Sequence, residues 1–104
     1  MNAFEGLLAR FAEHGFTLLP HTRAATTDLF IRANGNGFVH CEWTREKANQ
    51  HYFVIYNTEQ GRLRKATYCV DGSSCTVLVH ESNITSHFDF ENVDKLLTHL
   101  FENL

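Results

Sequence analysis

Seven histidines are the side chains of this sequence best suited to chemistry, because imidazole binds metals and exchanges protons near neutral pH. A zinc site needs three or four His, Cys or carboxylate ligands around one point. His40 and Glu42 alternate onto one face of a predicted strand, and His80 lies on another predicted strand. Ligand spacings such as C-x-x-C or H-E-x-x-H do not occur in the sequence. We keep a metal- or small-molecule-dependent function or enzyme built on these three residues as the alternative, and expect no cofactor.

A nucleophilic enzyme is not indicated by the remaining reactive residues. Cys41 stands between His40 and Glu42, but strand alternation turns it to the opposite face from both neighbours. Ser73 and Ser74 belong to a predicted turn, and the sequence holds no G-x-S-x-G motif. The glycine-rich segment 34–37 joins two predicted strands, which favours a hairpin over a phosphate-binding loop. We predict no catalytic residues.

Tyrosine and arginine side chains offer a different function, the binding of another protein. A three-residue turn at 59–61 pairs Thr58 with Arg62 in the predicted hairpin, and therefore Tyr56 with Arg64 and Tyr52 with Tyr68. Both residue types are enriched at interfaces between proteins. In this register one face carries the four residues that we predict to bind a partner: Tyr52, Tyr56, Arg64 and Tyr68.

The elements that must position these residues follow from hydrophobic periodicity. Apolar residues recur at helical spacing from about residue 2 or 3 to His14, where Gly15 ends the run, and again from Val93 to Leu104. Asn2 is the expected N-cap of the first helix, and Asp89 or Asn92 that of the second. Between these runs apolar residues alternate, and turns interrupt them. The sequence predicts a single α+β domain over residues 1–104, with an antiparallel β-meander of about five to seven strands bracketed by two amphipathic helices. A polar loop at 45–50 could hold one helical turn.

Both faces of the predicted sheet are substantially apolar, which is unusual for an antiparallel sheet with one side in water. If both helices cover one face, the other face is left for a partner, a ligand or a second copy of the chain. If one helix covers each face, neither is left open. The sequence does not choose between these arrangements, nor does it fix the strand order.

Charge and composition narrow the class of partner. Nine Lys and Arg against twelve Asp and Glu give a net charge of −3, so we do not expect nucleic acid to be the partner. No run of 18 apolar residues and no signal peptide is present, and we expect a cytoplasmic protein that does not enter a membrane. Three cysteines suit a reducing compartment. A three-residue loop at 71–73 would set Cys69 opposite Cys75, and whether they form a disulfide stays open.

These observations favour a non-catalytic cytoplasmic protein, an adaptor or an inhibitor, that recognises another protein through a sheet face or an exposed strand edge. We expect it to be a homodimer. The order helix, meander, helix is also found in small adaptors and inhibitors, but a shared architecture does not fix function.

Overall fold

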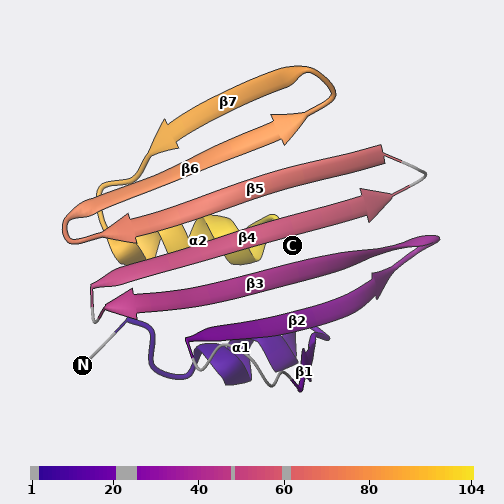
Figure 1. The fold of residues 1–104 in the computed structure, drawn as a ribbon, viewed down its shortest axis with the longest axis horizontal. Helices are drawn as coiled ribbons and strands as arrows, with labels where there is room; N and C mark the ends of the chain where they lie inside the picture. The colour runs from indigo at the N-terminus through magenta and orange to yellow at the C-terminus, as the bar shows by residue number, and fades with distance from the viewer. Residues whose placement is uncertain (1–2, 21–25, 48, 60–61) are drawn as a thin grey trace.

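The protein folds around one seven-stranded antiparallel sheet whose strands follow each other in chain order, β1 to β7 (Figure 1). The computed structural model describes residues 3–20, 26–47, 49–59 and 62–104. An N-terminal helix, α1, precedes the sheet and a C-terminal helix, α2, follows it. The predicted α+β class and the antiparallel meander are confirmed. The elements are α1 (Leu7–Glu13), β1 (Thr17–Leu19), β2 (Thr27–Asn34), β3 (Gly37–Lys47), β4 (Gln50–Glu59), β5 (Arg62–Asp71), β6 (Ser74–Glu81), β7 (Ile84–Asp89) and α2 (Val93–Glu102).

Two-residue loops join several of these strands. Asn34 pairs with Gly37 across the β2–β3 turn, and Asp71 pairs with Ser74 across the β5–β6 turn. The first loop residue is a glycine in both turns, with φ of +57° at Gly35 and +62° at Gly72. Glycine adopts positive φ at little steric cost, which explains why hairpins form at these positions.

One predicted loop is instead part of a strand. β3 continues through Arg45 to Lys47, with a shift in its pairing to β4 between these two residues. The expected helical turn within 45–50 was therefore wrong. A bulge lets the strand absorb an extra residue, which a polar sequence alone does not distinguish from a loop.

α1 ends and α2 begins close to the expected signals, but α1 begins later than expected. α1 starts at Leu7 rather than at residue 2 or 3, after Gly6 with a φ of +73°, and the predicted Asn2 cap lies outside the described residues. Gly15 adopts the expected left-handed conformation, with a φ of +85°. Asn92 caps α2 by accepting a hydrogen bond from the Lys95 backbone N–H at 2.9 Å.

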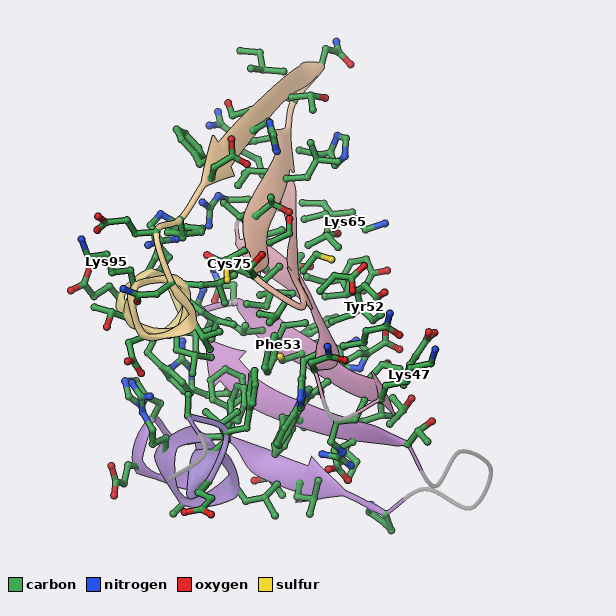
Figure 2. The ribbon with its side chains drawn as sticks, turned by 90° about the vertical axis from the view of Figure 1, so that its left-hand side faces the viewer. Lys47, Tyr52, Phe53, Lys65, Cys75 and Lys95 are labelled. Atoms are coloured by element: carbon green, nitrogen blue, oxygen red, sulfur yellow. The ribbon has the colours of Figure 1, made fainter. Side chains whose placement is uncertain are left out.

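Both helices lie on the same face of the sheet, and the main core fills the space beneath them (Figure 2). Phe11 of α1 stacks on Phe30 of β2 with ring centroids 4.3 Å apart. Trp43 is buried and its indole N–H donates to His51 Nδ1 at 3.2 Å, so the single tryptophan belongs to the core. From α2, the core receives Leu96, Leu97, Leu100 and Phe101.

A candidate protein-binding face

The side of the sheet away from the helices is the candidate site, and we call it the open face. No helix or strand in the described ranges covers it, and Tyr52 and Lys65 point outward from it in Figure 2. Because side chains alternate along a strand, every second residue of each strand belongs to this face. Its larger apolar and aromatic members are Leu29, Ile31, Phe38, Tyr52, Val54, Tyr56, Leu63 and Leu78.

Exposed apolar side chains of the open face come from three strands, β3, β5 and β6. Phe38 of β3 and Leu63 of β5 both pair with Thr58 of β4, and Leu63 is 56% exposed. Leu78 of β6 pairs with Thr67, which in turn pairs with Val54 of β4. The half-buried Thr58, Thr67 and Val54 lie between these exposed side chains, which are therefore spread over the open face.

A row of aromatic and basic residues crosses the middle of the open face. The pairing runs from His40 to Tyr56, from Tyr56 to Lys65, and from Lys65 to His80. The rings of His40 and Tyr56 stack with centroids 5.9 Å apart, and Lys65 Nζ lies 5.6 Å from the centroid of the Tyr56 ring. These contacts restrict the rotation of the three side chains.

A hollow of about 310 Å³ lies at one end of this row. Leu63, Lys65 and His80 line it together with the β6–β7 turn. Thr85 closes one side, with its hydroxyl 2.9 Å from His80 Nδ1. The hollow therefore offers apolar carbon and hydrogen-bonding groups together.

The four residues predicted to bind a partner do not share one face. Tyr52 and Tyr56 lie on the open face, whereas Arg64 and Tyr68 lie on the face that the helices cover. The predicted register was wrong by one residue, since Tyr56 pairs with Lys65 and Tyr52 with Cys69. The physical reason is the loop length. Glu59 pairs with Arg62, so two residues rather than three separate the paired ends, and one residue fewer turns every side chain of β5 to the other face.

Tyr68 and Arg64 have structural partners on the helix side. Tyr68 is 1% exposed, and its hydroxyl lies 2.8 Å from His99 Nδ1 of α2. Burial raises the pKa of Tyr68 to about 12. Arg64 Nε lies 3.8 Å from a carboxylate oxygen of Glu81 on β6.

The alternative metal ligands are not brought together. His40 and Glu42 share the open face, as expected, but His80 lies three strands away. At about 4.8 Å between strands this separation is about 14 Å, too far for one ion. Within the described residues no group of three His, Cys, Asp or Glu is placed to hold a metal.

The three cysteines are not joined by disulfides. Cys69 pairs with Thr76 and Cys75 pairs with Val70, so the two thiols that could have formed a bridge lie on opposite faces. The cause is the length of the β5–β6 loop. A loop of three residues would have placed Cys69 opposite Cys75, but the loop has two. Cys75 and Cys41 are buried, and burial raises the pKa of both thiols.

Sequence reasoning missed Lys65 as a member of the candidate site. The segment Glu59-Gln60-Gly61-Arg62 also fits a two-residue hairpin loop with glycine in its second position, which would have placed Lys65 opposite Tyr56. The signal was present in the sequence, but two turn types competed for it.

No protein family model, curated protein or solved structure matches this chain. In the part of the chain that the structure describes, no helix has the length and apolar character to span a membrane.

Proposed function

We propose that this chain is a non-catalytic binding protein, an adaptor or an inhibitor, that recognises another protein through the open face of its sheet. It acts in the cytoplasm, where a reducing environment suits three free thiols, and as a homodimer.

The arrangement of both helices on one face supports this proposal above all other observations. An antiparallel sheet can be stable with one face packed against helices and the other face in water. Apolar residues on the water-exposed face are therefore not needed by the core. Phe38, Leu63 and Leu78 nevertheless stand exposed on that side, which also carries the stacked His40 and Tyr56. Aromatic anchors with apolar neighbours and a polar surrounding are the composition of a protein interface.

A photocrosslinking experiment tests the proposal. A benzophenone amino acid replaces Tyr56 on the open face, and in a matched control it replaces Glu102 on the exposed side of α2. Each variant is expressed and irradiated in the cells from which the protein comes, and crosslinked proteins are identified by mass spectrometry. We expect one protein to crosslink at position 56 and not at position 102.

Affinity for that purified protein then decides the role of the face. Tyr56→Ala combined with Lys65→Ala should weaken binding by about tenfold or more, as for the central residues of an interface. Glu102→Ala should bind like the unaltered chain, and circular dichroism verifies that every variant is folded. Equal crosslinking at the two positions, or an affinity unchanged by the double substitution, would overturn the proposal.

A further inference from the structure

The two edges of the sheet differ in how they are protected. β1, at one edge, is three residues long and is followed by Pro20, which cannot donate a backbone hydrogen bond. β7, at the other edge, pairs with β6 over six residues without a register shift. Its sequence has no proline or lysine, and no strand of the described chain pairs with its outer side (Figure 1). Proteins usually protect such an edge, so β7 is suited to pair with another strand.

The backbone groups that β7 offers can be assigned residue by residue. Along an antiparallel strand the N–H and C=O of one residue point to one side, and those of the next residue point to the other. The N–H of Phe90, directly after β7, donates to the Cys75 carbonyl of β6 at 2.7 Å. Even-numbered residues therefore point to β6. The outward groups belong to Thr85, His87 and Asp89.

Two large apolar side chains flank this edge on the helix side of the sheet. Ile84 is 69% exposed and Phe88 is 51% exposed, with the Phe88 ring centroid 6.5 Å from that of His99 on α2. They lie four residues apart, with Ser86 midway between them.

We propose that a second copy of this chain pairs with β7 edge to edge, about a two-fold axis through Ser86. The axis is perpendicular to the sheet, so each residue of one copy must lie opposite a residue of the other copy whose side chain is on the same face. This condition holds only when the axis passes between two copies of the same residue. With the axis at Ser86, Ile84 of each copy lies opposite Phe88 of the other. Thr85 and His87, both outward-pointing, exchange backbone hydrogen bonds across the junction.

The two exposed apolar side chains of β7 complement each other across a two-fold axis, which favours a second copy of the chain as the partner. The same requirement favours one register over the others. An axis at Thr85 would set Ile84 opposite Ser86, and an axis at His87 would set Phe88 opposite Ser86. Only the axis at Ser86 joins the two exposed apolar side chains, in the aromatic and β-branched pair that stabilises antiparallel strands. The symmetry also sets both open faces on the same side of one continuous sheet, which would present two binding faces together.

This inference deepens the homodimer in the proposed function and rests on it, and a disulfide test examines the register directly. Ser86→Cys, in a Cys69→Ser background, places two thiols opposite each other at a non-hydrogen-bonded pair with Cα atoms about 4.5 Å apart. This distance lies within the range that a disulfide accepts. The matched control is Asn83→Cys, whose two copies would lie about 20 Å apart along the strands. We expect mild oxidation to link Ser86→Cys into a covalent dimer and to leave Asn83→Cys unlinked.

Sedimentation over a concentration series tests the hydrogen bonds. His87→Pro removes an outward N–H from each copy and leaves the β6–β7 pairing intact, whereas His87→Ala keeps the N–H and removes the ring. We expect His87→Pro to weaken dimerisation by about tenfold or more and His87→Ala to change it little. If His87→Pro does not fold, the comparison of Ser86→Cys with Asn83→Cys still tests the β7 dimer.

Three outcomes would overturn the inference. The unaltered chain could stay monomeric at every concentration, or it could dimerise while Ser86→Cys fails to crosslink. In the third outcome, Val54→Glu on the open face abolishes the dimer and His87→Pro retains it. A β7 dimer whose open face crosslinks no other protein would instead contradict the proposed function alone.

Discussion

Tyr68 illustrates how the surroundings of a residue decide its role. Its type suits an interface, but it lies in the core with its hydroxyl on His99, and burial holds its pKa at about 12. Tyr56 has the same side chain, and it lies on the open face between His40 and Lys65. The difference comes from the strand on which each tyrosine lies and the register of that strand.

Alkaline pH should reveal the buried position of Tyr68. The folded protein keeps the phenol proton up to about pH 12, whereas the unfolded chain releases it near pH 10. The contribution of this group to stability is therefore complete below pH 10 and is lost as the pH rises toward 12. Two pK units correspond to about 3 kcal/mol.

Urea unfolding at a series of pH values measures this loss. The free energy of unfolding should fall less between pH 10 and 12 in Tyr68→Phe than in the unaltered chain, because phenylalanine has no proton to release. Other groups titrate in the same range, but they are common to both proteins. Identical pH dependence in the two proteins would show that the Tyr68 hydroxyl is not buried in this way.

At the scale of elements, α2 closes the core over the second half of the sheet. It packs on β5 and β6, and Leu100 is fully buried at their contact. Thr98, two residues earlier, is exposed, and its hydroxyl donates to the Asp94 carbonyl of the same helix. Substitutions at these two positions can therefore distinguish the contribution of packing on the sheet from that of the helix itself.

Leu100→Ala should lower the free energy of unfolding by about 2–5 kcal/mol, because it removes buried carbon and leaves a cavity. Thr98→Ala, the control in the same helix, should change it by no more than about 0.5 kcal/mol. Chemical denaturation measures both. Similar losses in the two variants would mean that α2 contributes through its own helicity rather than through packing on the sheet.

For the whole molecule, the order of strands predicts a gradient of local stability. β3, β4 and β5 have a neighbour on each side, whereas β1 and β7 are edge strands. Amides in central strands exchange with solvent only when neighbouring strands separate, but edge strands open by themselves.

Hydrogen exchange followed by NMR should show this gradient. In dilute solution, where β7 is unpaired on its outer side, we expect the slowest exchange in β4 and the fastest strand amides at Thr85 and His87. Their alternate neighbours Ser86 and Phe88 should be slower, since their N–H groups face β6. Uniform exchange across β4 and β7 would contradict the gradient.

Much of the architecture could be predicted from the sequence because its signals are local. Helical spacing predicts α1 and α2, glycines at 35 and 72 mark tight turns, and alternation predicts the strands between them. These features depend on residues within a few positions of each other, so a single sequence contains the information. The metal alternative failed for the opposite reason, because the distance between His40 and His80 depends on how many strands separate them.

The sequence by itself determined the fold class and most of the strands, and it offered Asp89 or Asn92 as the cap of α2, of which the structure shows Asn92. Only the tertiary structure decided which residues of different strands share a face. A loop one residue shorter than expected exchanged Arg64 for Lys65 beside Tyr56, because a shift of one residue reverses the faces of a whole strand. Packing also placed both helices on one side of the sheet. That choice depends on contacts between distant segments, and it is the choice that leaves the open face uncovered.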